Sequence, residues 1–150
     1  MNWFLLLKSL HVLSAIVAVG ANLTYGVWSA LAKKEPAHLP FALRGIKLID
    51  DRVANPAYGV LLATGLIMAF TTYTITLTWI LVGLSAYVVM AVLGVAVISP
   101  ALSAQMRALD GEGAASPRYL AAEARVRGIG MFLGVLVVAV VIVMVAKPQF

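Results

Sequence analysis

Apolar residues form four long runs along the chain, and the segments between them hold most of the charged side chains. The pattern predicts helices at about residues 3–32, 55–72, 78–100 and 124–146, the last beginning outside the membrane near residue 117. Each run reaches or approaches the ~20 apolar residues that a helix needs to cross a bilayer. We therefore expect an all-α protein, a transmembrane four-helix bundle in a single domain over residues 1–150.

The connection between the first two runs has a pattern of its own. Within residues 42–51, apolar and charged positions fall on opposite faces of a helix. This pattern predicts a short helix lying in the membrane interface. An Asn-Pro pair at residues 55–56 and a Ser-Pro pair at residues 116–117 then predict capped starts for the second and fourth crossings.

Turn signals predict how the crossings are connected. The uncharged linker at residues 71–78 predicts a tight antiparallel hairpin between the second and third crossings. Pro100 is expected to kink or stop the third crossing. The sequence Asp-Gly-Glu-Gly at residues 110–113 predicts a loop before the fourth helix.

Composition places the chain among integral membrane proteins. Hydrophobic residues make up 63% of it and charged residues only 11%, against about 25% charged residues in soluble domains. The net charge is +5, but the basic residues lie at the ends of hydrophobic runs, so we expect no nucleic-acid partner. The lack of cysteine excludes disulfides and cysteine-ligated metals.

The distribution of basic residues predicts an orientation. Nine of the eleven lysines and arginines lie in the two long connections. The positive-inside rule then puts both connections in the cytoplasm and both ends of the chain outside. We expect a multi-pass protein of the bacterial inner membrane, with the first run retained because no basic residues precede it. The nine residues are Lys33, Lys34, Arg44, Lys47, Arg52, Arg107, Arg118, Arg125 and Arg127.

The first run carries Lys8, His11 and Asn22 on one helical face, interspersed with small residues. Polar groups at membrane depth are costly, so this face should point into the bundle. A neutral imidazole at position 11 can bind haem iron or another metal, or handle a proton. Alternatively, His11 and Asn22 only form hydrogen bonds with neighbouring helices. Lys8 either extends to the interface or pairs with an anion such as a propionate or a lipid phosphate.

A second ligand beside His11 is not obvious. His38, the other histidine, lies in a connection on the far side of the membrane, so a bis-histidine haem within one subunit is not expected. Met68 or Met144 could complete the site, since both lie roughly at the depth of His11, although methionine in apolar helices commonly fills space. The candidate site is thus His11, as haem or metal ligand, with Lys8, Asn22 and Met68.

Other motifs are weaker. A GxxxG spacing at residues 130–134 suits close helix packing, either inside the bundle or between subunits. No crossing contains a carboxylate, and no phosphate loop, zinc-ligand spacing or nucleophile-base set is present.

Two segments, LKSLHVLSAIVAVGANL and IDDRVANPAYGVLLATGLIMA, carry a family resemblance. Through Lys8-x-x-His11, Asn55-Pro56 and Thr64-Gly65, the whole chain resembles a family of small bacterial integral membrane proteins classed only as a domain of unknown function. More distantly, the first run looks like that of HemJ-type protoporphyrinogen oxidases and CopD-type copper-resistance proteins, where a histidine follows a lysine. HemJ-type proteins bind haem b, so this resemblance implies that His11 is a haem ligand.

Two functional hypotheses remain. The first is a small membrane protein that binds haem b or a metal and takes part in redox or tetrapyrrole chemistry. The alternative is a non-enzymatic scaffold or accessory subunit, whose partners would be membrane lipid and either a second copy or a larger membrane complex.

Overall fold

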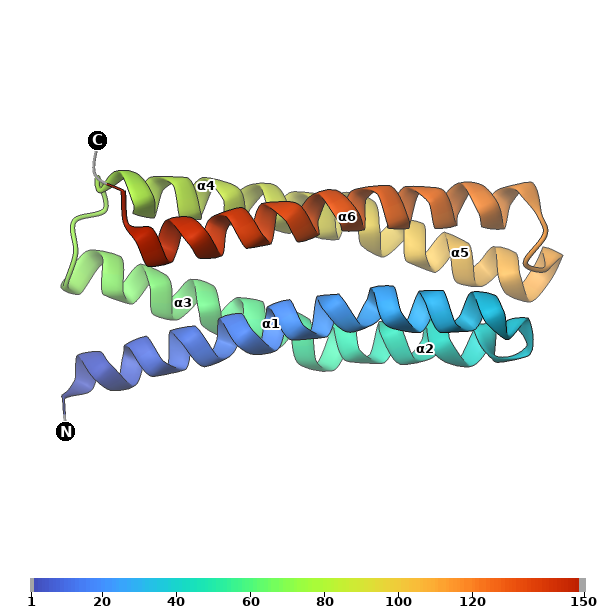
Figure 1. Cartoon of the computed structure of the whole chain (residues 1–150), viewed down its shortest axis with the longest axis horizontal. Coiled ribbons are helices and arrows are strands. Elements are labelled where there is room, and N and C mark those ends of the chain that lie inside the picture. Colours follow the sequence, from blue (N-terminus) through green and yellow to red (C-terminus); the bar gives the residue numbers. More distant parts are fainter. Residues whose placement is uncertain (1, 149–150) are drawn as a thin grey trace.

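The structure, a computed structural model, describes residues 2–148 and is a bundle of long helices (Figure 1). Within these residues, four helical segments are long and apolar enough to cross a membrane: Trp3–Lys34, Pro36–Thr71, Thr78–Glu112 and Pro117–Ala146. The predicted all-α membrane bundle is therefore confirmed. Its elements are α1 (Trp3–Lys34), η1 (Pro36–His38), α2 (Leu39–Ile49), η2 (Asp50–Ala54), α3 (Asn55–Thr71), α4 (Thr78–Leu93), η3 (Gly94–Ile98), α5 (Ser99–Glu112) and α6 (Pro117–Ala146).

The helices pack as two antiparallel pairs (Figure 1). α1 packs along α2, η2 and α3, while α6 packs along α4, η3 and α5. The linker after α3 is as short as expected, but α3 packs mainly on α1, and α4 packs on α6. The second and third crossings are thus antiparallel and joined by a short linker, as predicted, but each packs mainly on another helix, because a short linker fixes only how far apart two helix ends lie. Side-chain fit decides which helices pack.

Two wide π turns make the second and third crossings continuous. η2 ends two residues before Pro56, and η3 ends two residues before Pro100. Proline has no N–H for the helical ladder, and a wide turn accommodates the missing bond without ending the helix. Consequently α2 continues the line of α3 beside α1 and does not lie across the bundle, and Asn55 does not cap a separate helix (Figure 1).

The start of the fourth helix follows its sequence signal. Ser116 is extended, and its hydroxyl accepts a hydrogen bond of 3.2 Å from the backbone N–H of Tyr119. α5 runs to Glu112, so the predicted loop is shorter than expected. It begins at Gly113, whose φ of 86° ends the helix in a conformation that favours glycine.

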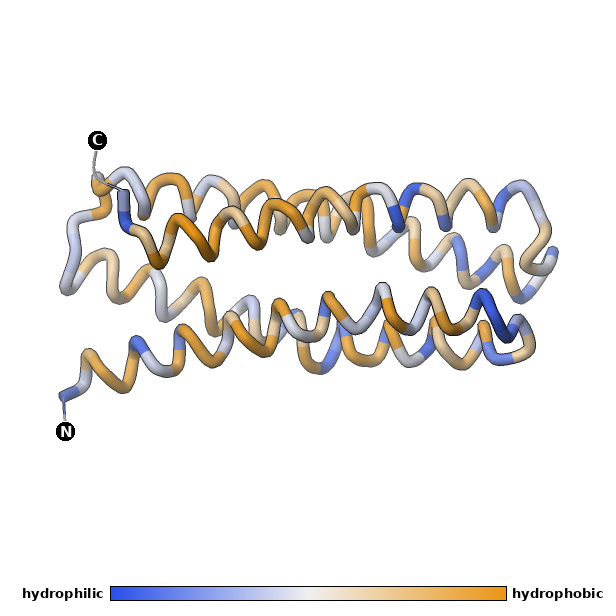
Figure 2. Tube along the Cα trace, viewed as in Figure 1, coloured by the Kyte–Doolittle hydropathy of each residue, from blue (hydrophilic) through white to orange (hydrophobic). Residues whose placement is uncertain are grey.

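The two helical pairs are held together at both ends of the bundle. At the charged end, Lys33 of α1 and Glu123 of α6 form an ion pair of 2.6 Å, and this end also contains a buried core of alanine, leucine and isoleucine residues with Tyr119. At the opposite end, the ammonium of Lys147 lies 5.2 Å from the ring centres of Tyr73 and Trp79. Figure 2 shows more hydrophilic positions over the half of the bundle that holds α2, α5 and the start of α6, and mostly hydrophobic positions over the other half.

Candidate functional site

His11 is fixed against α3 at two points. Its Nδ1 lies 3.0 Å from the hydroxyl oxygen of Thr64. Its Cε1 lies 3.0 Å from where a Cβ would sit on Gly65, so the ring packs directly on the backbone of α3. The small residue at position 65 lets the imidazole approach, and the neighbouring threonine supplies a polar atom.

The hydrogen bonds of Thr64 determine which arrangements of the His11 ring proton are possible. The hydroxyl oxygen lies 2.7 Å from the carbonyl oxygen of Val60 and 3.1 Å from that of Leu61. When the hydroxyl donates its single proton to one of these carbonyls, it offers a lone pair to His11. The neutral ring then carries its proton on Nδ1, and Nε2 keeps a lone pair; when the hydroxyl donates to Nδ1 instead, Nε2 carries the proton. The first of these two arrangements leaves Nε2 with the lone pair that a metal ligand needs.

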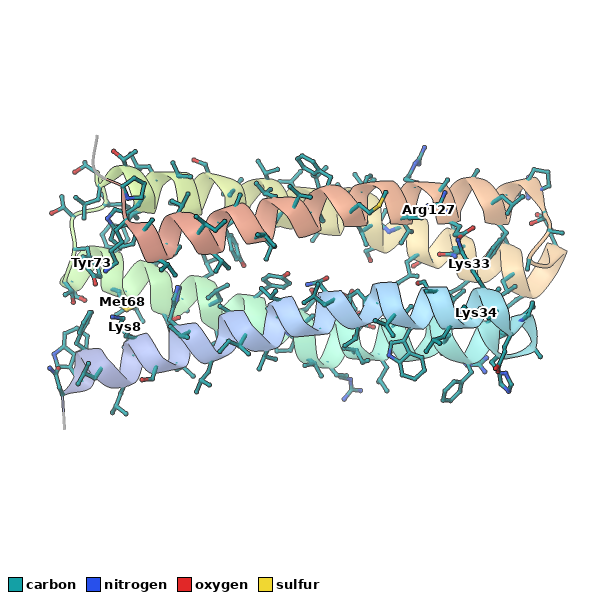
Figure 3. The ribbon with its side chains drawn as sticks, in the orientation of Figure 1. Lys8, Lys33, Lys34, Met68, Tyr73 and Arg127 are labelled. Carbon is teal, nitrogen blue, oxygen red and sulfur yellow. The ribbon has the colours of Figure 1, made fainter. Side chains whose placement is uncertain are left out.

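Lys8 and Met68 lie one helical turn from this contact. Lys8 precedes His11 by three residues and Met68 follows Thr64 by four, so each shares a helix face with the contact. Figure 3 shows both labelled residues at the same end of the α1–α3 pair. Lys8 is exposed, whereas Met68 is buried, with 7% of its surface accessible. Lys8 can therefore meet an anion, whereas Met68 is a packed side chain.

Asn22 belongs to a second polar contact. Its amide Nδ2 donates to the hydroxyl of Tyr58 at 2.6 Å and to the carbonyl oxygen of Ala18 at 2.9 Å. Eleven residues separate it from His11, about 16 Å along a helix axis. The predicted polar face of α1 therefore contains two sites, and Asn22 does not support His11.

The sequence did not identify the partners of this second contact. The hydroxyl of Tyr87 in α4 donates to the carbonyl oxygen of Tyr58 at 3.2 Å, which ties α3 to α4. Nearer the charged end, the hydroxyl of Tyr25 donates to a carboxylate oxygen of Asp50 at 3.3 Å. A tyrosine in an apolar run looks like packing, and Asp50 looks like part of a solvated connection, so only Asn22 signalled that a polar partner exists.

The other predicted candidates lie apart from His11. The Cε methyl of Met144 packs against Gly83 in the other helical pair. His38 is exposed and pairs with Glu35 at 3.0 Å, in keeping with a solvated residue. Across residues 2–148 there is no group of three or more His, Asp or Glu residues that could hold a metal ion. A metal ion bound at His11 without a porphyrin would need further ligands other than the described His, Asp and Glu side chains.

Comparison with known proteins gives one match. Residues 5–148 match the family described as "Predicted integral membrane protein (DUF2269)". No curated protein matches the chain, and no solved structure does.

Proposed function

The chain belongs to DUF2269, a family of predicted integral membrane proteins, and we propose that it binds one haem b through Nε2 of His11. The observation that carries the proposal is the 3.0 Å contact between Nδ1 of His11 and the hydroxyl of Thr64, which orients the ring and, with the proton on Nδ1, leaves Nε2 free. Metal-binding histidines are commonly held in this way through their other nitrogen. The resemblance of the first helix to HemJ-type proteins agrees with this proposal.

Haem suits the residues around His11 better than a bare metal ion does. A porphyrin brings four nitrogen ligands to its iron, so one protein nitrogen is enough to hold it. A bare ion needs about three protein ligands, and residues 2–148 contain no cluster of that kind. Lys8, exposed one turn from His11, can pair with a propionate. Met68 is left out, because it is buried where α1 and α3 pack together.

The chemistry that haem would supply is one-electron exchange, and the chain's own contribution is to hold and orient it. The hydroxyl of Thr64 contacts Nδ1 of His11 and orients the ring. Because Gly65 has no side chain, the ring can pack directly on the backbone of α3. The resemblance to HemJ-type proteins does not extend to further intramembrane histidines, so we propose binding within redox or tetrapyrrole chemistry and no specific oxidase reaction.

The absorption spectrum of the purified full chain tests this proposal. We expect protein from haem-replete cells to show haem bands that change on reduction with dithionite, with about one iron per chain. His11→Ala should lose these bands, while His38→Ala, which changes an exposed histidine, should keep them. Wild-type protein without haem bands, or equal bands in all three proteins, would contradict the proposal.

A second candidate function is a scaffold or accessory subunit, favoured by the exposed glycines of α6. Gly130 and Gly134 lie one helical turn apart, and a Cβ on either would meet nothing within 4 Å. They therefore do not pack inside this chain and leave room for another helix backbone, as in GxxxG contacts.

The mass of the protein in detergent tests the scaffold. Gly130→Leu with Gly134→Leu is expected to reduce a dimer to a monomer, because leucine side chains would block close helix approach. Gly128→Leu, which changes another open position of the same helix, is the matched control. A wild-type monomer, or equal effects of both changes, counts against a glycine-mediated dimer.

We also propose that the charged end of the bundle faces the cytoplasm of a bacterial inner membrane. The concentration of lysine and arginine in the two connections at this end supports this orientation. The chain has no cysteine, so single cysteines can be labelled selectively. Ala115→Cys should react only from inside and Thr74→Cys only from outside, and the reverse result would overturn the orientation.

A further inference from the structure

A cavity of about 270 Å³ opens between η3, α5 and α6, in the helical pair that does not contain His11. Almost all the residues that line the cavity are small or aliphatic, and the one charged residue among them is Arg125. We propose that this cavity binds the headgroup of an anionic glycerophospholipid, with the phosphate held by Arg125. The proposal does not depend on haem binding.

The backbone explains why space exists here. The helix widens in η3 just before Pro100, and Ala96, Val97 and Pro100 form one wall. Ala121 and Ala122 of α6 form part of the opposite wall. These alanine side chains are too small to fill the space between the two helices.

Arg125 lies at the depth of lipid phosphates. Lys147, with Tyr73 and Trp79 around it, has the aromatic and basic character of a membrane-boundary anchor. Arg125 precedes Lys147 by 22 residues, about 33 Å along a helix. This length is close to the ~30 Å thickness of the hydrocarbon core, so Arg125 reaches the opposite boundary.

The charge of Arg125 is available for an anion. Among the described residues no carboxylate forms an ion pair with Arg125, whereas Glu123 is within reach of Lys33 and Arg127, and Glu112 pairs with Arg118. Guanidinium groups bind phosphate oxygens through paired, charge-assisted hydrogen bonds.

The volume of the cavity suits a headgroup and is too small for a whole lipid. Because α5 and α6 are antiparallel, Ala96 and Val97 lie toward the membrane centre, while Ala104 and Ala121 lie toward the charged end. A volume of about 270 Å³ corresponds to roughly nine water volumes. That volume accommodates a phosphate with its glycerol groups, and the acyl chains would lie in the surrounding bilayer.

Native mass spectrometry of the full chain in detergent tests this site with added phosphatidylglycerol and phosphatidylcholine. We expect tighter binding of phosphatidylglycerol. Arg125→Gln should weaken it about fivefold, the effect of one basic residue near a lipid surface. Arg127→Gln is the matched control, because Arg127 does not line the cavity and lies 3.9 Å from Glu123.

A cavity-filling variant provides a second test. Ala121→Leu should reduce phosphatidylglycerol binding while keeping the charge of Arg125, and Ala124→Leu, an exposed position outside the cavity, should not. Equal losses in Arg125→Gln and Arg127→Gln would show binding by general surface charge and overturn the proposal. Unchanged binding in Ala121→Leu, or full competition by equimolar glycerol phosphate, would also overturn it.

Discussion

A leucine at position 65 is expected to abolish haem binding. The Cε1 atom of His11 lies 3.0 Å from where the first side-chain carbon would sit, closer than carbon atoms pack without displacement. A leucine therefore pushes the imidazole off α3 and breaks its 3.0 Å contact with Thr64. Overpacking of this kind costs about 1–3 kcal/mol in stability. The measurements are haem content per chain and the unfolding midpoint in detergent.

Gly59→Leu is the matched control for this change. Gly59 lies in the same helix, and a Cβ there meets nothing within 4 Å. Away from such contacts, surface substitutions usually change stability by less than about 0.5 kcal/mol. If Gly65→Leu and Gly59→Leu have the same haem content and the same midpoint, the close packing of His11 on α3 is incorrect.

Replacing Thr64 by valine is expected to weaken haem binding by about 10–100-fold, the usual effect of removing the group that orients a ligating histidine. Valine has nearly the shape of threonine but cannot accept the proton of His11 Nδ1. Nδ1 would then lose its 3.0 Å partner, and the preference for a proton on that nitrogen would weaken. Haem titration measures the affinity, and ¹⁵N NMR of the haem-free protein reports which ring nitrogen carries the proton.

Thr71→Val separates this effect from loss of a helix hydrogen bond. Thr71 donates to the carbonyl oxygen of Ile67 at 2.7 Å, as Thr64 does to Val60, but lies beside no histidine. We expect Thr71→Val to leave both haem affinity and the NMR signal of His11 unchanged. A signal that shows the proton on Nε2 in the wild type would refute the arrangement with the proton on Nδ1.

The sequence was sufficient to predict the four membrane helices, because crossing a bilayer demands long apolar runs and leaves little choice of structure. The sequence was a less reliable guide where one short motif is compatible with two local structures. Asn55-Pro56 commonly starts a helix, but here the preceding residues close a π turn and the helix continues. In the continuous form both α2 and η2 pack along α1, and the motif itself does not say which helix they will meet.

The residues that α1 contributes to the candidate site could be predicted from the sequence, but their partners on the facing helix could not. Helical periodicity puts Lys8, His11 and Asn22 on one face, but it does not say which helix lies opposite. Pairing with α3 made Thr64 the partner of His11 and Tyr58 the partner of Asn22. Both hydrogen bonds agree with the simpler hypothesis that polar residues join membrane helices. The haem proposal adds to it an Nε2 left free by a proton on Nδ1.

The central claim is that Nε2 of His11 binds haem iron, and rescue by imidazole tests it most directly. His11→Gly would open a space beside Gly65 that free imidazole can enter. We predict that His11→Gly lacks haem bands, that added imidazole restores a spectrum close to that of the wild type, and that His38→Gly needs no imidazole. Haem bands of equal strength in His11→Gly without imidazole, or wild-type protein that binds no haem at all, would contradict the claim.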